Sequence, residues 1–546
     1  MDAACIEESK GLRQREGKVR KMEPDRYNRQ RRAPERRQGG QRMPSEYSRR
    51  RESPERYERA RRERILARRR RQVRRQLMII GCFFLILVIV VFSLCARAVR
   101  SIRNSRMEGR VAEALAETYE KSEVADDSGS GQKFAKWLMA QCTEEELQDL
   151  SDFAEENDGA LTEKQIYDVT GSTLHVLEDM RQGLLDDADT ARKNGIWVLN
   201  EGGSAQEEAG QSGSGNTAAG KSGNQEKGAA RITVAGDLCF AEDGFVLDHY
   251  DEVNDLEKCI SPEILDITQS ADVFFLNHEY AISDRGEPLE GKYYTFRAKP
   301  ERMKLLEQMG TDLVSLANNH VYDYGPEAML DTTDLLDEAG IAYVGGGRNI
   351  DEAERPAYFI VNGMKIGFVA ASNAEKTKYT PAATEDSPGI LEAYDTTEFN
   401  RVISQASEEC DYLIAYIHWG PEDETQHTEE QTEEGTGFLE SGADIVVGGH
   451  PHVLEGIGYI DGKPIVYSMG DFWFNDETKY TGLLNLDITY DGLKEMSFTP
   501  CLQTDYTTQY ISDESEQREM FDYLEGLSDG VKIDDGGVIM EASGEK

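Results

Sequence analysis

The sequence of 546 residues lacks any regular cysteine pattern. It contains no C-x-x-C pair, and the five cysteines beyond residue 100 are odd in number and widely spaced: Cys142, Cys239, Cys259, Cys410 and Cys501. A zinc knuckle needs paired cysteines, and a small disulfide-stapled fold needs an even, closely spaced set. The spacing therefore excludes both classes, although one disulfide bond of undetermined pairing remains possible.

Basic residues are scarce beyond position 76. Residues 1–76 hold 27 Lys and Arg against 12 Asp and Glu, whereas the rest of the chain holds 34 against 91, so the net charges are +15 and −57. This asymmetry favours different surroundings for the two parts. The first part is rich in Arg and Glu with few apolar residues, which predicts a disordered tail. Binding to anionic lipid or nucleic acid is the alternative for the tail, but we expect no nucleic-acid partner.

Long apolar runs are also absent, with one exception. Residues 77–96 (LMIIGCFFLILVIVVFSLCA) carry no charge, and a helix of about 20 residues spans about 30 Å, the thickness of a bilayer core. A secretory signal peptide fits less well, because the run begins late and lacks a small-x-small cleavage site. The run predicts one transmembrane helix. The Arg-rich stretch Arg61–Arg75 predicts a cytoplasmic N-terminus, cell-membrane localisation and an extracellular C-terminal domain.

Residues 101–230 divide into two parts by composition. Residues 101–200 carry apolar side chains at helical spacing, with a capping-box pattern at Thr143 and Glu146, and predict a helical stalk or subdomain. Residues 201–230 consist mostly of Gly, Ser, Ala, Gln and Asn, which predicts a flexible linker.

Residues 231–500 alternate short apolar runs with helical patterns, which predicts an α/β domain with a mixed sheet. The expected strands are Ile232–Ala235, Val273–Leu276, Leu313–Ala317, Tyr358–Val361, Ile366–Ala371, Leu413–Ile417 and Ile445–Val447. The expected helices are Pro300–Met309, Pro326–Glu338, Thr396–Glu408 and Glu430–Ser441. Hairpin turns are expected at Asn362-Gly363, Asp461-Gly462 and Asp491-Gly492. Residues 501–546 are interpreted as an acidic C-terminal tail.

Polar side chains follow five of the expected strands. They occur in Gly236-Asp237, Asn277-His278-Glu279, Asn318-Asn319-His320, His418-Trp419-Gly420 and Gly448-Gly449-His450-Pro451-His452, and they include five of the eight histidines. A single histidine after a strand is more often structural than functional. Because sites in open α/β sheets form at the carboxyl ends of strands, the five together predict a metal site. Mixed His, carboxylate and Asn ligands suit one or two divalent ions of Mn, Zn or Fe.

The segments GDLCF, NHE, LANNHVYDYG, YIHWGPE and GGHPHVLEGIGYIDGKPIVYSMGDFWF resemble, in order and character, the CapA family of bacterial capsule proteins. That family is named for poly-γ-glutamate synthesis and belongs to the calcineurin-like metallophosphoesterase superfamily. The resemblance covers about residues 231–500. It implies a metallophosphoesterase-like mixed β-sandwich flanked by helices, here preceded by the transmembrane helix and the small helical region.

The resemblance also implies residue roles. The implied metal ligands are Asp237, Glu279, Asn319, His418, His450 and His452, and the implied catalytic residues are Asp237 and His320. In that arrangement Asn319, His418 and His450 hold one ion, Asp237 and His452 hold the other, and Glu279 (or Asn277) is shared.

Two departures from the superfamily pattern weaken the ion at Asp237. Cys239 stands where the first strand usually carries a histidine, and the second motif offers Asn-x-Glu instead of Gly-Asp-x-x-Asp. We therefore expect one well-formed and one weak ion site. Three further histidines are expected elsewhere: His278 facing away from Glu279, His175 in a structural role, and His427 at most at the rim of the pocket.

Three functions are compatible with the sequence. The first is a membrane-anchored factor in the synthesis, export or anchoring of an anionic capsule polymer such as poly-γ-glutamate, acting with the polymer or its synthesis machinery. The second is an extracellular metal-dependent phosphoesterase or related hydrolase, with His320 as general acid. The third is a non-catalytic, metal-stabilised binding module of the cell envelope. The acidic outer region repels a polyanion at close range, so a polyglutamate would need the metal site or a local basic patch.

Overall fold

The computed structural model describes residues 89–94, 97, 104–105, 107–125, 130–199, 229–242, 246–374 and 379–542. The chain divides into two compact units, Met1–Cys95 and Ala96–Lys546. The predicted tail at 1–76, most of the predicted transmembrane helix at 77–96 and most of the predicted linker at 201–230 lie outside the described residues. Among the helices that are described, none is long and apolar enough to cross a membrane.

A helical region follows in the second unit and has an apolar core of its own. It comprises a helix at 107–121, α2 (Gly131–Gln141), α3 (Glu144–Glu156), α4 (Glu163–Thr170) and α5 (Leu174–Gln182). Thr143 begins α3 with the predicted capping box, because its side chain accepts from the N–H of Glu146 and the Glu146 carboxylate accepts from the N–H of Thr143. Gly171 ends α4 in the left-handed conformation, with φ at 70°.

The first sheet has seven strands in the order β1-β9-β10-β12-β13-β15-β14. They are β1 (Ile196–Leu199), β9 (Ala357–Val361), β10 (Met364–Ser372), β12 (Tyr412–His418), β13 (Ile445–Gly449), β14 (Ile457–Ile460) and β15 (Lys463–Val466). Strands β10, β12 and β13 run parallel, with His418 level with Gly449. The carboxyl ends of β12 and β13 therefore meet at one edge of this sheet.

The second sheet has eight strands, with the order β19-β18-β17-β2-β3-β6-β7 and β16 paired to β2. They are β2 (Ala229–Leu238), β3 (Val273–His278), β6 (Leu313–Ser315), β7 (Ala342–Val344), β16 (Asp471–Trp473), β17 (Lys479–Thr489), β18 (Gly492–Thr504) and β19 (Thr507–Tyr510). Strands β2, β3, β6 and β7 run parallel. Asp237 is level with Asn277 on one side and with Asp471 on the other.

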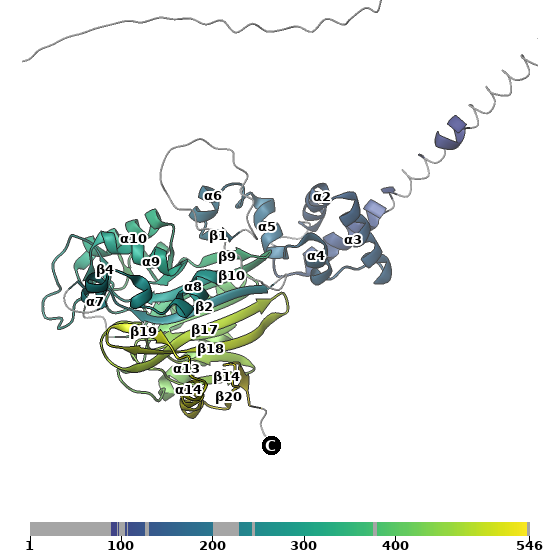
Figure 1. The fold of residues 1–546 in the computed structure, drawn as a ribbon. Coiled ribbons are helices and arrows are strands. Elements are labelled where there is room, and N and C mark those ends of the chain that lie inside the picture. The colour runs from purple at the N-terminus through teal and green to yellow at the C-terminus, as the bar shows by residue number, and fades with distance from the viewer. Residues whose placement is uncertain are drawn as a thin grey trace, which may run out of the picture. The chain divides into compact units, whose positions relative to one another are not determined.

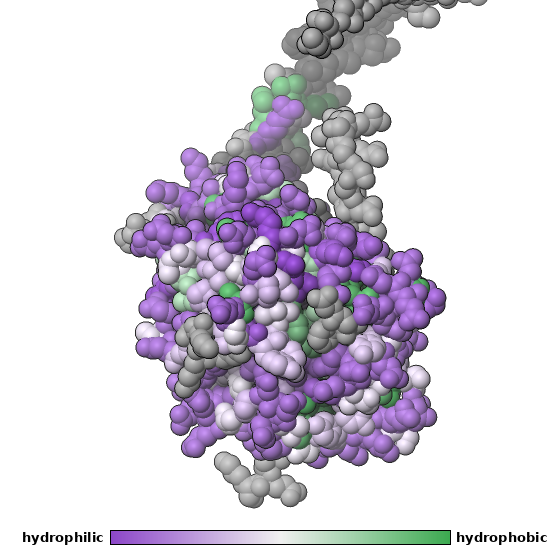
Figure 2. Space-filling model, turned by 90° about the vertical axis from the view of Figure 1, so that its left-hand side faces the viewer, coloured by the Kyte–Doolittle hydropathy of each residue, from purple (hydrophilic) through white to green (hydrophobic). Residues whose placement is uncertain are grey.

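The two sheets enclose one apolar core, and helices cover their outer faces (Figure 1). Side chains alternate between the faces, so Ile232 and Ile414 lie in the shared core whereas Leu238 and Leu413 lie in separate outer clusters. The outer helices are α7 (Val246–Val253), α8 (Pro262–Ser270), α9 (Met303–Met309) and α10 (Gly325–Ala339) on the second sheet, and α12 (Thr397–Ser407) and α13 (Glu429–Glu440) on the first. The predicted α/β class is confirmed. The face shown in Figure 2 is mostly hydrophilic.

The predicted strands and hairpins of this domain agree with the structure. Each of the seven expected strands falls on an observed strand, and all three expected turns join antiparallel pairs. Asn362 and Gly363 have φ values of 50° and 73°, and Asp461 and Gly462 have 51° and 81°. Positive φ at both central residues is the conformation that type I′ turns require, which explains the sequences Asn362-Gly363 and Asp461-Gly462.

The interpretation of residues 501–546 as an acidic tail is wrong over the part that the structure describes. This part completes β18 and forms β19, α14 (Glu514–Leu527), β20 (Val531–Ile533) and β21 (Ile539–Glu541). Met520, Phe521 and Leu524 of α14 are buried in the core cluster of the two sheets. The remaining elements are short: α6 (Ala188–Lys193), α11 (Ile350–Ala353), the 3₁₀ turns Leu256–Lys258 and Pro300–Arg302, β4 (Ala281–Ile282), β5 (Arg297–Ala298), β8 (Gly346–Gly347) and β11 (Gly389–Ile390).

The helical region packs against the amino-terminal end of β10. The Lys365 ammonium pairs with the buried Asp179 carboxylate at 2.7 Å, and His175 Nδ1 lies 2.8 Å from Asp411 Oδ1, as expected for a structural histidine. The Thr173 N–H donates to the Gly363 carbonyl at 2.9 Å. Because β10 runs parallel to β12, these contacts lie at the opposite ends of the strands from His418.

Candidate metal centre

The predicted site residues converge where the parallel strands of the two sheets end. Asp237 lies near the end of β2, Glu279 follows β3, His418 ends β12 and His450 follows β13. All four side chains are buried. The carboxyl ends of strands from both sheets thus bring together ligand-type residues that are far apart in the sequence, as the sequence pattern predicted.

Asn277 joins three of these groups through one amide nitrogen. Its Nδ2 donates to Asp237 Oδ1 at 2.8 Å and to Glu279 Oε2 at 3.1 Å, and it lies 3.3 Å from His418 Nδ1. Asn318 Nδ2 donates to Asn277 Oδ1 at 3.0 Å, which fixes the orientation of the amide. Since the nitrogen that faces the site is a donor, Asn277 orients the acidic groups and Glu279 is the better candidate for a shared ligand.

Three groups of side chains are close enough to hold a metal ion. They are Glu279 with His450 and His452, Asp237 with His452 and Asp471, and Asp237 with Glu279 and His418, and in each group the ligand atoms lie within 4.8 Å of one another. Asn319 adds an oxygen, because its Oδ1 lies 2.9 Å from His418 Nε2. Two ligands at about 2.0–2.2 Å from one ion lie about 3 Å apart, so this separation also fits joint coordination.

Unpartnered polar atoms support a cation at this place. Glu279 Oε1, His450 Nδ1 and Asn319 Nδ2 are buried without a hydrogen-bond partner. Buried polar atoms in native proteins are almost always paired, so each such atom needs an explanation. A divalent cation would explain the unpaired carboxylate oxygen and imidazole nitrogen. The mixture of His and carboxylate donors fits Mn, Zn or Fe.

The loop after β13 is strained in a way that aims its two histidines. His450 and His452 have φ values of 96° and 58°, a region that non-glycine residues rarely adopt. The N–H of His450 donates to Asp237 Oδ2 at 3.0 Å, which ties the loop to β2. A Cβ on Gly449 would lie 2.7 Å from Asp237 Oδ1 and 2.1 Å from the Tyr416 hydroxyl, so only glycine permits this close approach.

Burial governs the protonation of the site. Burial, followed by the charge of Glu279, raises the pKa of Asp237 to about 6, and burial raises the pKa of Glu279 to about 7. Burial lowers the pKa of His418 to about 4 and that of His450 well below its ordinary value. For His452, burial lowers the pKa, but the carboxylates of Asp471 and Glu279 outweigh it and raise the pKa to about 10. A divalent cation here would favour ionised carboxylates and neutral imidazoles.

His320 lies beside the centre and belongs to none of the three groups among the described residues. Its Nδ1 lies 2.7 Å from Asp323 Oδ2, and its ring packs against Phe296 with centroids 4.3 Å apart. The neighbouring Asn319 supplies the amide described above. This placement puts a histidine that could transfer a proton beside the groups that could hold a metal ion.

Sequence reasoning missed Asp471, Lys292 and Lys479. Asp471 Oδ1 lies 2.8 Å from His452 Nδ1, and Lys479 pairs with the same carboxylate at 3.6 Å. Lys292 pairs with Asp323 at 2.8 Å. A signal for Asp471 was present, because Gly470-Asp471 follows an apolar run just as Gly236-Asp237 does.

Three other predicted features fall outside the cluster. Cys239 is buried among apolar residues, which raises the pKa of its thiol well above the ordinary value, and it belongs to none of the metal groups among the described residues. His278 packs against Tyr280 with ring centroids 3.9 Å apart, and burial lowers its pKa to about 3. His427 stacks on Tyr467 at 3.7 Å. Asp471 supplies a carboxylate to the Asp237 side of the centre, where Cys239 supplies no ligand.

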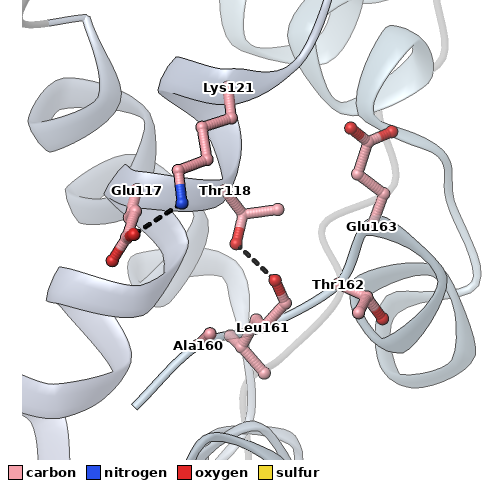
Figure 3. Close-up of a pocket in the computed structure, with 7 residues that line it drawn as sticks. All are labelled: Glu117, Thr118, Lys121, Ala160, Leu161, Thr162 and Glu163. Atoms are coloured by element: carbon pink, nitrogen blue, oxygen red, sulfur yellow. Dashed lines mark hydrogen bonds and ion pairs between the residues drawn. The ribbon is translucent and has the colours of Figure 1, made fainter. Parts of the chain in front are cut away.

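A surface pocket of about 210 Å³ lies elsewhere, in the helical region (Figure 3). Thr118 donates to the Leu161 carbonyl at 2.8 Å across it, and Lys121 pairs with Glu117 at 2.6 Å at its side. These polar groups already satisfy one another. The pocket shares no residue with the metal centre, and we assign no chemistry to it.

The chain thus has a two-sheet α/β fold whose strand ends bring together His, Asp, Glu and Asn side chains, in groups that could hold a metal ion. Residues 231–476 match the family model described as bacterial capsule synthesis protein PGA_cap. The chain therefore carries a domain that matches the PGA_cap family, and the PGA_cap domain belongs to the metallophosphoesterase-like superfamily. The resemblance drawn from the motifs is thereby confirmed.

Two curated relatives and one solved structure illustrate the similarity. The PGA biosynthesis protein CapA of Bacillus subtilis (strain 168) is 32% identical over 204 residues, 37% of this chain and 53% of the relative. The capsule biosynthesis protein CapA of Bacillus anthracis is 30% identical over 211 residues, 37% and 50% of the two chains. The chain spans about half the length of these relatives. A hypothetical protein from Thermus thermophilus aligns with 50% of this chain and 99% of its own, at 16% identity and a TM-score of 0.31.

Proposed function

We propose that this protein acts in the synthesis, export or anchoring of an anionic capsule polymer such as poly-γ-glutamate, through a divalent metal centre. The observation that carries the proposal is the buried Glu279 carboxylate, whose Oε1 has no hydrogen-bond partner and faces His418 and His452 at 3.6 and 3.9 Å. The PGA_cap domain and the two CapA relatives, which are named for PGA and capsule biosynthesis, supply the biological direction.

The three clusters define how the centre would hold ions. The three possible sets of ligands are Glu279 with His450 and His452, Asp237 with His452 and Asp471, and Asp237 with Glu279 and His418, the last with Asn319 beside His418. When bound, a divalent ion supplies Lewis-acid polarisation of a phosphoryl or carbonyl oxygen and lowers the pKa of water. Because these sets share residues, the number of bound ions depends on which sets bind an ion at the same time.

The chain's own residues contribute orientation and proton transfer. Asn277 holds the carboxylates of Asp237 and Glu279 in place. Asp323 fixes the Nδ1 side of His320, so the Nε2 atom can hold a proton for a leaving group. Because the site is buried, bulk water is excluded and the electrostatic interactions within the centre are stronger than they would be in water.

An anionic ligand would have to reach the centre itself, because the basic residues between positions 231 and 302 are already engaged in other contacts. Arg231 pairs with Asp487, Arg285 with Asp331, and Arg302 with Glu242 and Asp251. Lys299 pairs with Glu242, and Arg297 donates to backbone carbonyls. These residues therefore form no open basic patch, and the polymer would be recognised by the metal centre.

We further propose that the chain is anchored in the cell membrane by residues 77–96, with residues 1–76 in the cytoplasm and the PGA_cap domain outside. The apolar length and the Arg-rich flank support this arrangement. Fractionation of cells that express the full chain or a version without residues 1–96 tests it. The full chain is expected in the membrane fraction and accessible to external protease, and recovery of the full chain in the soluble fraction would exclude the anchor.

The polymer role is tested by deletion and complementation in the native host. Loss of the gene is expected to abolish or shorten the anionic surface polymer, and the unaltered chain is expected to restore it. A chain with His450→Gln and His452→Gln should fail to restore the polymer at equal protein level. Restoration by that double variant would instead favour a binding module whose metal centre is dispensable.

A metal-dependent phosphoesterase is the second candidate, and the His320–Asp323 pair beside the centre favours it. Purified chain loaded with Mn²⁺ is expected to hydrolyse bis(p-nitrophenyl) phosphate. His320→Ala should lower turnover by about 10²–10⁴-fold with the metal retained, the usual contribution of a general acid. Failure to hydrolyse a panel of phosphate esters, with metal bound, would exclude this candidate.

A further inference from the structure

Two histidines of the centre are each held by a buried aspartate that pairs with a lysine. In the first set, His320 Nδ1 lies 2.7 Å from Asp323 Oδ2, and the other oxygen, Oδ1, lies 2.8 Å from Lys292 Nζ. The Asp323 side chain is fully buried and that of Lys292 is 4% exposed. The Phe296 N–H also donates to Asp323 Oδ2 at 2.7 Å. The carboxylate is thus held from three directions.

The second set repeats this order of groups at His452. His452 Nδ1 lies 2.8 Å from Asp471 Oδ1, and Asp471 Oδ2 lies 3.6 Å from Lys479 Nζ. Asp471 is fully buried and Lys479 is 15% exposed. Lys479 also pairs with Glu477 at 2.6 Å. The residues come from β16, β17 and the loop after β13, so the fold assembles this set from separate elements.

Each aspartate sets the direction of its imidazole. A carboxylate at Nδ1 favours the proton on that nitrogen, which leaves Nε2 to face the centre. His452 Nε2 indeed faces Glu279 Oε1, at 3.9 Å. A buried carboxylate that lacks a countercharge is unfavourable, so the lysine supplies the countercharge for the aspartate that holds the imidazole.

We propose that Lys292 and Lys479 are positioning residues, each completing a Lys–Asp–His relay that presents one imidazole Nε2 to the centre. This inference rests on the proposed metal-dependent function. The two relays serve different steps: in the group with Glu279 and His450, His452 offers Nε2 and Asp471 is its outer partner, so Lys479 acts on metal affinity. His320 belongs to none of the metal-binding groups among the described residues, so Lys292 acts on turnover. Lys292 also donates to the Asn319 carbonyl, which holds the loop that carries His320.

The experiment uses the purified full chain with Lys479→Met or Lys292→Met. Mn²⁺ binding is measured by titration calorimetry, and hydrolysis of bis(p-nitrophenyl) phosphate is measured at saturating Mn²⁺. Loss of an outer partner of a metal ligand typically costs about 10–100-fold. Lys479→Met is therefore expected to weaken Mn²⁺ binding about 10–100-fold, whereas Lys292→Met should lower turnover by a similar factor and change Mn²⁺ affinity by less than about threefold.

Two other lysines provide matched controls. Lys299 pairs with Glu242 at 3.4 Å and Lys463 with Asp444 at 3.3 Å, both away from the centre. Lys299→Met and Lys463→Met are expected to leave affinity and turnover unchanged. Lys479→Arg and Lys292→Arg keep the charge and should recover at least part of each loss. Circular dichroism melts in EDTA report whether a methionine variant is merely unfolded, in which case the arginine variants decide.

The outcomes separate this inference from the function on which it rests. A wild-type chain that does not bind Mn²⁺ would overturn the proposed function and the relays together. A wild-type chain that binds Mn²⁺ while Lys479→Met binds equally well would overturn the Lys479 relay alone. Wild-type turnover in Lys292→Met, or a wild type that binds Mn²⁺ without any hydrolysis, would remove the Lys292 relay and leave the Lys479 relay to stand on affinity.

Discussion

The amide of Asn277 donates to the Asp237 carboxylate at 2.8 Å, and both side chains are fully buried. The same nitrogen donates to Glu279. One neutral amide therefore separates two carboxylates whose mutual repulsion contributes to the raised pKa of Asp237. Substitution of Asn277 therefore tests how the centre is held together before any ion binds.

Asn277→Asp should destabilise the metal-free protein. The change replaces the shared donor by a third carboxylate and leaves Asp237 and Glu279 without their hydrogen bond. Unsatisfied buried groups typically cost about 1–3 kcal/mol, and we expect a loss of this size in urea unfolding with EDTA. Asn349→Asp is the matched control, because Asn349 accepts from the Glu352 N–H at a helix start, where Asp serves equally well. Equal stability of the two variants would contradict the role assigned to Asn277.

Local sequence determined the parallel strands well. The runs at β10, β12 and β13 are apolar on both faces because both faces are covered, and such runs are recognised without knowledge of the neighbours. The polar residues after β2, β3, β12 and β13 could also be grouped in advance, since parallel strands place their carboxyl ends together. For these elements the sequence pattern was sufficient.

Long-range pairing explains most of what was missed. Strand β16 has three residues, and only its pairing with β2 brings Asp471 level with Asp237. Strand β1 likewise exists through its pairing with β9, far away in the sequence. In α14, acidic residues concealed an apolar stripe that includes Met520 and Leu524. The spacing of residues within each of these segments does not show which distant segment it pairs with or packs against.

Divalent metal should stabilise the folded chain. A ligand that binds only the native state adds about 2.7 kcal/mol at a concentration of about 100 times its Kd. We expect Mn²⁺ to raise the melting temperature measured by calorimetry, and EDTA to reverse the change. His450→Gln should remove most of the increase. His427→Gln is the control, because His427 stacks on Tyr467 outside the ligand groups, and it should retain the increase. A melting temperature insensitive to metal in the unaltered chain would argue against the centre.

The contact between His175 and Asp411 should make stability depend on pH. Burial lowers the pKa of His175, but the hydrogen bond and charge of Asp411 outweigh it and raise the pKa above its ordinary value. A raised folded-state pKa gives a contribution that is fully present below the unfolded value of about 6.5. That contribution is lost as the pH rises through the folded value.

Urea unfolding of the unaltered chain and His175→Gln at about pH 5.5 and about pH 9, on either side of the ordinary histidine pKa, measures this contribution. The free-energy difference between the two chains should be larger at the lower pH. Asp411→Asn removes the charge that raises the pKa, so in that background the extra loss at the lower pH should shrink. A difference that is constant between the two pH values would show that His175 stabilises by packing alone.

Gly449→Ala should disturb the geometry of the centre without removing any of its candidate ligands. The added Cβ would lie 2.1 Å from the Tyr416 hydroxyl and 2.7 Å from Asp237 Oδ1, so the loop carrying His450 and His452 must move. Overpacking of this kind typically costs about 1–3 kcal/mol, and stabilisation by Mn²⁺ should disappear. Gly526→Ala in α14 is the control, because nothing lies within 4 Å of its Cβ position. Alanine in a helix is favoured over glycine by about 0.5–1 kcal/mol, so the control should be neutral or more stable. Retained Mn²⁺ stabilisation in Gly449→Ala would mean that the close approach of β13 to Asp237 is not required for metal binding.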